Sequence, residues 1–340
     1  MSGVVTATKL GPADNFSPAG AVAPGMTFSR NPHPSRRTVV AAAGGSLSLP
    51  LLRTPAHADP APRRGGLDLR WLGTTGWRFE HEGHVLAVDP YLTRFRTGLA
   101  AGAFDPSTPL RVDEEACRAV SDVRTVLVTH SHWDHVADVP HLAVRDGARV
   151  LGSLTTASLV RAMGVPEAST STLRGGEQLD LGEYVVHALP ALHSRTASWS
   201  VLFPGVRTTV PEPPATISDL PEGDTLGFHV RPCSGPSVLV LGASDVDDRA
   251  LQGLRPDVVT APVPSNDATH DYLPRLLEAL GRPPVVVPSH WDDFESPLSN
   301  PPRPATPDLA RRLEAFELDV RRISPRSRVV RPRYLEPLPL

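Results

Sequence analysis

The stretch Thr129-His130-Ser131-His132-Trp133-Asp134-His135 decides how the rest of the chain is interpreted. It follows an apolar run, Thr125 to Thr129, which predicts a buried strand. Three imidazoles and one carboxylate therefore follow closely on a strand end, and such donors suit zinc and related divalent ions. Histidine makes up only 13 of 340 residues, so a polar surface loop with chance histidines is the weaker explanation. The stretch predicts a metal site.

A chain that leaves a strand without regular structure can fold back on itself. His130 and His132 can then face one metal ion, while Asp134 and His135 face a second. Two divalent ions held about 3.5–4 Å apart form a common arrangement in hydrolytic enzymes. The stretch is therefore compatible with a site for one or two ions.

The pattern His130-x-His132-x-Asp134-His135 resembles the signature of the metallo-β-lactamase superfamily. Other parts of the chain stand in the order typical of that family, and the likeness extends from about Leu67 to Leu335. These parts are an aspartate that ends an early strand, a later lone histidine, a glycine at a strand end and a final histidine after an apolar strand: Asp89, His193, Gly242 and His290.

Within the superfamily, the chain is most similar to the branch of L-ascorbate-6-phosphate lactonase and N-acyl-phosphatidylethanolamine phospholipase D. Two short motifs carry this narrower likeness, Gly73-Thr74-Thr75-Gly76 near the start and Ser289-His290-Trp291-Asp292 near the end. The first relative implies a sugar lactone as substrate, and the second implies a lipid phosphodiester. A β-lactam substrate is less expected, because the likeness lies elsewhere in the superfamily.

The resemblance implies a ligand set for each ion. The first ion is expected on His130, His132 and His193, and the second on Asp134, His135 and His290. The resemblance also implies that Asp89 supports the histidine loop from behind, since such a carboxylate fixes the tautomer of a ligand. The alternative for Asp89 is a strand-end cap, and a lone histidine such as His193 is structural in most sequences.

The chain departs from the family pattern after Gly242. Members with two ions usually carry an aspartate directly after this glycine, and its carboxylate bridges the ions. Here that position is Ala243, and Asp245 comes two residues later. Either the backbone turns so that Asp245 reaches the ions, or the bridge is missing and the second ion binds weakly. We include Asp245 among the metal-ligand candidates and expect it near the site without a normal bridging role.

The periodicity after residue 66 predicts an alternation of strands and helices, with no repeat and no linker. Strands are expected, among others, at Leu67–Leu72, Val85–Val88, Glu183–Leu189, Ser198–Phe203, Leu226–Val230, Ser237–Leu241, Val258–Ala261 and Val285–Val287. Helices are expected at Asp113–Val120, Val139–Arg145, Ala157–Met163, Tyr272–Leu280 and Pro307–Asp319. The family resemblance implies an α+β fold, the four-layer αβ/βα sandwich, over residues 67–340. Two long loops, 92–111 and 204–224, carry no motif, and we expect the second to overhang the metals.

Residues 1–66 are rich in Ala, Gly, Pro and Ser and predict a disordered tail. They contain Arg36-Arg37, then a mildly apolar run, then Ala56-His57-Ala58, which resembles a twin-arginine export signal cleaved after Ala58. The lysine that often follows the motif is absent, and a tail with a chance arginine pair is the alternative. Translation from Met26 instead of Met1 gives a compact signal. The signal implies the twin-arginine translocon as a partner and an exported protein.

The amino-acid composition limits the kinds of protein that this chain can be. Hydrophobic residues make up 40% of the chain, enough for a sizeable core, and the net charge of −3 does not indicate a nucleic-acid partner. The two cysteines, Cys117 and Cys233, lack metal-binding spacing, and two separate buried thiols are expected rather than a disulfide. The sequence predicts no particular oligomeric state.

These patterns predict a metal-dependent hydrolase in which a metal-bound hydroxide attacks an ester, lactone or phosphodiester bond. Zinc is the expected ion and manganese the alternative. Asp134 is the candidate that holds the nucleophile, and His270 is a weaker candidate for the proton donor to the leaving group. The substrate is expected to be a small molecule or a lipid. The competing hypothesis is a noncatalytic, exported metal-binding protein on the same fold, and the completeness of the ligand set favours the enzyme.

Overall fold

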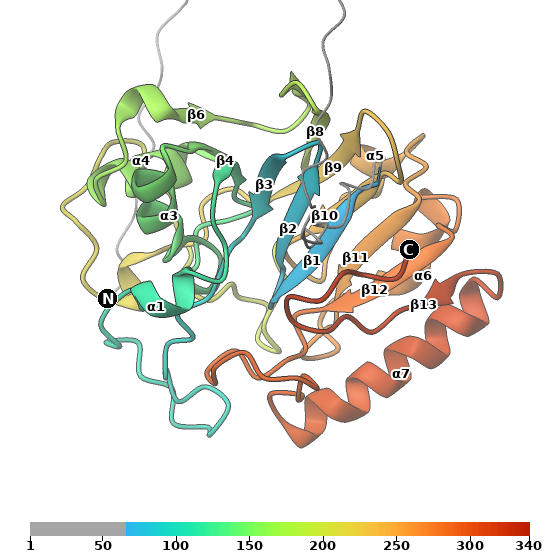
Figure 1. The fold of residues 1–340 in the computed structure, drawn as a ribbon. Coiled ribbons are helices and arrows are strands. Elements are labelled where there is room, and N and C mark those ends of the chain that lie inside the picture. Colours follow the sequence, from blue (N-terminus) through green and yellow to red (C-terminus); the bar gives the residue numbers. More distant parts are fainter. Residues whose placement is uncertain (1–65) are drawn as a thin grey trace, which may run out of the picture. The chain divides into compact units, whose positions relative to one another are not determined.

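The computed structural model describes residues 66–340, which form two β-sheets flanked by helices (Figure 1). The predicted disordered tail, its export signal and the cleavage after Ala58 lie outside the described residues. The first strand begins at Asp68, close to the predicted start of the folded domain.

The first sheet combines two hairpin connections with a parallel half. Its first three strands are antiparallel, and the next three continue parallel to the third. The strands lie in sequence order: β1 (Asp68–Gly73), β2 (Gly76–His81), β3 (His84–Val88), β4 (Val123–Leu127), β5 (Arg149–Gly152) and β6 (Thr170–Thr172). Parallel strands end at the same edge, so residues that follow β3 and β4 meet there.

The second sheet repeats this mixture in reverse order. Its antiparallel part precedes a parallel part that runs from the fourth strand to the last. The strands are β7 (Gln178–Asp180), β8 (Tyr184–Pro190), β9 (Leu226–Pro232), β10 (Val238–Leu241), β11 (Val258–Pro262), β12 (Val285–Ser289) and β13 (Arg328–Val329). The last residues of β10, β11 and β12 therefore share one edge.

The alternation of side chains along the strands explains the layers. In β3, Leu86 and Val88 join the core cluster that includes residues of both sheets, whereas Val85 and Ala87 join a second cluster with the helices of the first half. The helices of that half are α1 (Glu114–Cys117), α2 (Trp133–Val136), α3 (Val139–Asp146) and α4 (Leu154–Ala162). A strand that is apolar on both faces is thus buried between two layers.

The helices of the second half are α5 (Asp248–Leu251), α6 (Tyr272–Ala279) and α7 (Pro307–Ile323), and Figure 1 shows α6 and α7 flanking the second sheet. Their apolar residues, among them Leu276 and Leu313, belong to the same core cluster as Val258 and Val286. α7 begins at an N-cap, Thr306, whose side chain accepts a hydrogen bond from Leu309 N at 3.1 Å. The arrangement is the predicted αβ/βα sandwich, so the fold-class prediction is confirmed.

One predicted strand is wrong. Residues 198–203 form no strand but an irregular loop in which the hydroxyls of Thr196, Ser198 and Ser200 bond one another. Trp199 is 69% exposed, so this apolar residue has no sheet to pack against. Leu202 of this loop lines a pocket, described below. The sequence patterns also missed β6, β7, α2 and α5, which are all four residues or shorter.

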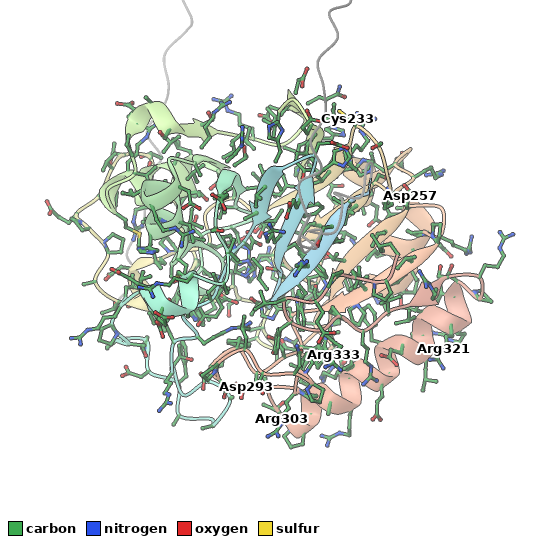
Figure 2. The ribbon with its side chains drawn as sticks, in the orientation of Figure 1. Cys233, Asp257, Asp293, Arg303, Arg321 and Arg333 are labelled. Carbon is green, nitrogen blue, oxygen red and sulfur yellow. The ribbon has the colours of Figure 1, made fainter. Side chains whose placement is uncertain are left out.

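The two cysteines do not pair. Cys117 is buried, as expected, but Cys233 is exposed directly after β9, where its Sγ lies 3.3 Å from Gly182 O. Figure 2 shows Cys233 at the opposite end of the view from Asp293, which lies three residues beyond a metal-ligand candidate. Cys233 is therefore remote from that end of the second sheet.

None of the helices in residues 66–340 combines the length and the hydropathy of a membrane-spanning segment.

Candidate metal centre

The metal-ligand candidates follow the ends of strands in both sheets. His130, His132, Asp134 and His135 follow β4, and the last two lie in the one-turn helix α2, which His132 caps at its N-terminus. His193 comes three residues after β8, and His290 comes directly after β12. The site therefore forms where the strand ends of the two sheets approach each other.

The structure brings six of the predicted ligands together in two groups of three. His130, His132 and His193 form the first group, and Asp134, His135 and His290 form the second. In each group one donor atom per residue lies within 4.8 Å of the other two. This is the grouping that the family resemblance implies.

In the first group, backbone carbonyls orient two of the imidazoles. His132 Nε2 lies 2.6 Å from Leu202 O, and His193 Nδ1 lies 2.8 Å from Ser194 O. Only a protonated ring nitrogen can donate to a carbonyl, so Nδ1 of His132 and Nε2 of His193 carry the free lone pairs. The free nitrogen of His193 faces His130.

In the second group, Asp134 is the shared partner. Its Oδ2 lies 3.1 Å from His290 Nε2 and 3.4 Å from His135 Nε2. His135 uses its other nitrogen, Nδ1, to bond Asp89 Oδ2 at 2.8 Å. Asp89 therefore orients His135, as expected for a carboxylate behind a metal ligand.

Asp89 is itself held by two threonines. It accepts hydrogen bonds from Thr129 N at 2.7 Å, from Thr129 Oγ1 at 2.5 Å and from Thr75 Oγ1 at 3.0 Å. Gly242 packs against the same threonine, and a Cβ atom on it would lie 2.0 Å from Thr129 Oγ1. The glycine at the end of β10 is thus needed for the close approach of the second sheet to the histidine loop.

The donor chemistry fits a cation in the first group. Because Thr129 Oγ1 donates its hydrogen to Asp89, it accepts from His130 Nδ1, 3.2 Å away. His130 Nε2 then carries a lone pair, and it lies 3.2 Å from the lone pair on His193 Nε2. Two lone pairs that face each other at this distance call for a cation between them.

The environment keeps the first group in the ligand form. Burial, followed by the charges of neighbouring histidines, holds the pKa of His130 well below its usual range. Burial lowers the pKa of His132 to about 3 and that of His193 to about 4. These imidazoles are therefore neutral at pH 7, and neutral imidazole is the form that binds metal.

The second group has the opposite electrostatics. Burial acts to lower the pKa of His135, but the charges of Asp134 and Asp89 outweigh it and raise the pKa to about 10. Burial acts to raise the pKa of Asp134, but His135 and His290 hold it well below its usual range. The carboxylates of Asp89 and Asp134 beside His135 therefore mark a place where positive charge is favoured.

Both groups line one cavity of about 310 Å³. Its remaining lining residues are mostly apolar or small, with one arginine. They are Leu99, Trp133, Ser194, Arg195, Thr196, Leu202, Gly242, Ala243, Ser244, Pro262, Val263, Ser265, Asn266 and Phe294. The cavity volume falls at the small end of the usual range for ligand pockets.

Two predicted site residues lie outside these groups. The Asp245 carboxylate accepts from Arg275 Nη1 at 3.2 Å and from Val246 N at 2.8 Å, and Ala243 and Ser244 line the pocket instead. Asp245 is therefore a turn residue with an ion-pair partner and belongs to neither donor group. Its inclusion among the metal-ligand candidates is corrected, and its position agrees with the alternative in which it makes no bridge. The side chain of His270 is 88% exposed beside Asp271 and does not line the pocket, so its proposed role as proton donor is also corrected.

The expected lid needs a correction too. None of residues 204–224 lines this cavity, whereas residues 222–224 line a neighbouring hollow of about 760 Å³. The pocket wall comes instead from Arg195, Thr196 and Leu202, just before the loop. The loop supports the site through its backbone, since Ser131 N donates to Glu222 O at 2.9 Å.

Sequence reasoning missed the residues that hold the second group from behind. His290 N donates to Thr74 O at 2.9 Å, Thr74 N donates to Asp292 Oδ1 at 2.9 Å, and Thr75 Oγ1 lies 3.0 Å from His135 Nδ1. The motif from Gly73 to Gly76 and the aspartate after His290 were visible in the sequence as marks of a family branch. Nothing in their spacing indicated that they contact each other.

Comparison with known proteins agrees with this geometry. Residues 68–290 match the model of a family described as the beta-lactamase superfamily domain, over more than half of the chain. A metal-dependent hydrolase of Polynucleobacter asymbioticus is 24% identical over 263 residues, which cover 73% of this chain and 84% of the relative. A metal-dependent hydrolase of Pyrobaculum arsenaticum is 26% identical over 232 residues, which cover 67% of this chain and 85% of the relative.

Among solved structures, a diiron β-hydroxylase of Streptomyces venezuelae shares the fold with a TM-score of 0.50 at 15% identity, covering 82% of this chain and 54% of that chain. A metallo hydrolase of Ignicoccus hospitalis has a TM-score of 0.48 at 18% identity, covering 80% of this chain and 96% of that one. With its two sheets, its histidine loop and the matched span, the chain belongs to the metallo-β-lactamase superfamily, among the metal-dependent hydrolases.

Proposed function

We propose that the protein hydrolyses an ester, lactone or phosphodiester bond of a small molecule or lipid, using one or two divalent metal ions. The observation that carries this proposal is the meeting of two three-donor groups in one cavity. A structural metal site is closed by four protein ligands, whereas three ligands per group leave a position for water or substrate.

The donor set supports zinc, with manganese as the alternative. Five imidazoles and one carboxylate make up the two groups, and nitrogen-rich sites of this kind favour zinc over magnesium or calcium. A divalent ion at such a site supplies Lewis-acid chemistry and lowers the pKa of bound water to about 7.

The protein's own contribution is orientation. Asp134 stays ionised, since its pKa is low, and its carboxylate serves as an acceptor that orients an attacking water. Asp89 and the carbonyl of Leu202 hold His135 and His132 in place. Apart from the six ligand candidates, the described residues that line the cavity include no His, Cys, Asp or Glu. The serine and threonine hydroxyls that line the cavity therefore have no carboxylate or imidazole base beside them other than the ligand candidates, and water is the nucleophile of this proposal.

A substrate screen with a matched pair of variants tests the proposal. Metal-loaded protein is assayed against lactones, phosphodiesters, phospholipids and β-lactams, with His132→Ala as the site variant and Asp245→Asn as the control. We expect His132→Ala to lose hydrolysis and bound metal, and Asp245→Asn to keep both. If the wild-type protein binds metal and hydrolyses none of the panel, the noncatalytic alternative is favoured.

We also propose that the protein is exported by the twin-arginine translocon. Support comes from Arg36-Arg37, the mildly apolar run after them and Ala56-His57-Ala58. Replacing both arginines by lysine is expected to trap the precursor inside the cell, and mass spectrometry of the exported protein is expected to find Asp59 at its N-terminus. A mature exported chain that still carries residues 26–58 contradicts this proposal.

A further inference from the structure

Arg195 is the one cationic side chain, other than the histidines, among the described residues that line the metal cavity. It comes two residues after His193 of the first donor group, and both residues line this cavity and the neighbouring hollow of about 760 Å³. A substrate bound near that group therefore has a guanidinium within reach. Guanidinium groups bind carboxylates and phosphates through paired, charge-assisted hydrogen bonds.

The segment that carries Arg195 is fixed from both sides. On one side, Ser194 Oγ accepts from Ser244 N at 2.8 Å and lies 3.0 Å from Ser244 Oγ. On the other side, the amide of Asn266 donates to Arg195 O at 3.0 Å. The side chain thus starts from a backbone that is held in place, which lowers the entropy lost when it binds a ligand.

The Arg195 guanidinium has no carboxylate within 4.0 Å and no hydrogen-bond acceptor among residues 66–340, although the side chain is partly buried. The positive charge of Arg195 acts on the carboxylate of Glu222. Burial raises the pKa of Glu222, and Arg195 acts to lower it. Glu222 accepts instead from Thr225 Oγ1 at 2.9 Å, so all five N–H groups of Arg195 are available to a ligand.

The cavity that Arg195 lines has polar walls near its backbone, at Ser194, Thr196 and Asn266, and an apolar part as well. Leu99, Leu202, Val263 and Phe294 line it together with the donor groups. Building on the function proposed above, we propose that the substrate has an apolar body, which packs on these four side chains, and an anionic group, which pairs with Arg195. The anionic group is a carboxylate or a phosphate close to the bond that is cleaved. Arg195 is then the specificity-determining residue of the site.

Binding of non-hydrolysable probes tests this inference without any assay of hydrolysis. Phenylacetate and phenylphosphonate are the anionic probes, and phenylacetamide is the neutral probe of similar shape. Each is titrated calorimetrically into the metal-loaded protein and its variants, after metal content and thermal unfolding have been shown to match. Because the readout is binding, the inference can fail while hydrolysis is observed, and it can hold while no substrate has been found.

We expect Arg195→Gln to weaken binding of the anionic probes about 10- to 100-fold, which corresponds to the usual strength of hydrogen bonds to charged groups, and to leave phenylacetamide unchanged. Arg195→Lys should lose part of this affinity, because a lysine lacks the paired donors. Glu222→Gln removes a competing negative charge and should tighten anion binding. Arg174→Gln, which removes an exposed arginine of the neighbouring hollow, is the matched control and should change nothing.

A stronger loss for phenylphosphonate than for phenylacetate supports a phosphate as the natural group, and the reverse supports a carboxylate. The inference is overturned if Arg195→Gln weakens the neutral and anionic probes equally, or if it matches Arg174→Gln.

Discussion

The backbone N–H of His290 donates to the carbonyl oxygen of Thr74 at 2.9 Å. The bond joins the end of β12 in one sheet to the turn between β1 and β2 in the other. Both residues have positive φ angles, 56° for His290 and 46° for Thr74, a conformation that costs energy for residues other than glycine. The strain is localised where the turn fixes a ligand of the second donor group.

The first prediction concerns the hydroxyl of Thr75, which lies 3.0 Å from both Asp89 Oδ2 and His135 Nδ1. Thr75→Val keeps the shape of the side chain and removes this bridge. We expect affinity for the second divalent ion to fall about 10- to 100-fold, as is usual when a partner of a ligand is lost. Metal titration after mild chelation measures it.

Thr74→Val is the matched control for Thr75→Val. It also removes a buried hydroxyl, but Thr74 Oγ1 has no hydrogen-bond partner within residues 66–340. Its metal affinity should equal that of the wild type. Equal losses in the two variants mean that packing of the turn, and not the bridge to His135, sets the affinity.

The sequence predicts the ligands better than it predicts what supports them. One short motif after an apolar strand contains four of the ligands, His130, His132, Asp134 and His135. A local motif of this kind can be recognised in the sequence without knowledge of the tertiary structure. Asp292 and Thr74 are 218 residues apart, and their contact arises only when the two sheets meet. The periodicity of the sequence does not indicate a hydrogen bond between residues so far apart in the chain.

The burial of Arg94 is another feature of the fold that the sequence does not predict. In the sequence Arg94 belongs to a loop rich in Gly, Pro and Arg, and this composition predicts an exposed loop. In the structure its side chain is 1% exposed, and it lies 3.1 Å from Asp292 Oδ2. Gly73, at φ 85°, leaves room for it, since a Cβ there would lie 1.5 Å from Arg94 Nη2. A buried arginine is recognisable only once its partner is known.

The second prediction follows from this buried pair. Asp292 Oδ2 accepts from Arg94 and from Tyr334 OH at 2.9 Å, and Asp292 Oδ1 accepts from Thr74 N. Asp292→Ala leaves the charge of Arg94 buried without its partner, and we expect the free energy of unfolding to fall by about 3–5 kcal/mol. Denaturant unfolding at pH 7 measures it.

Tyr334→Phe is the milder comparison for Asp292→Ala. It removes one hydrogen bond to the same carboxylate and keeps the ion pair, so the expected loss is about 1–2 kcal/mol. A loss in Asp292→Ala no larger than that in Tyr334→Phe contradicts the assignment of Arg94 and Asp292 as a coupled buried pair.

The third prediction concerns pH. His229 in β9 is 7% exposed, and its Nε2 has no partner among the described residues. Burial, then the charge of Arg231, lowers its pKa from 6.5 to about 4. Between these values the unfolded chain binds a proton that the folded chain does not, so stability is full above pH 6.5 and is lost as the pH falls toward 4.

His229→Gln should therefore flatten the acid limb of the stability curve. Between pH 7 and pH 4.5, we expect the wild type to lose on the order of 2 kcal/mol more than the variant. Chemical unfolding of metal-free protein at the two pH values measures this difference. Parallel curves for the two proteins mean that His229 takes up its proton in the folded state at its ordinary pKa.

The last prediction concerns Ala243, where the chain departs from the family pattern. Ala243 follows Gly242 at the end of β10 and lines the cavity beside both donor groups, and its methyl group cannot bind metal. Asp245 does not replace the missing carboxylate, because it pairs with Arg275. The second ion then depends on Asp134, His135 and His290 alone. We therefore expect wild-type protein to keep one tightly bound ion after mild chelation, and Asp245→Ala to behave in the same way.

Ala243→Asp should restore a second tight ion. A carboxylate there adds a full negative charge and an oxygen ligand next to both groups. An asparagine side chain has nearly the same volume as an aspartate side chain but no charge. Ala243→Asn therefore separates the effect of the added ligand from that of crowding. Metal content after chelation and calorimetric titration should give two ions for Ala243→Asp and one for Ala243→Asn. Two tight ions in the wild type, falling to one in Asp245→Ala, contradict this account, since Asp245 would then have to leave Arg275 and bind metal itself.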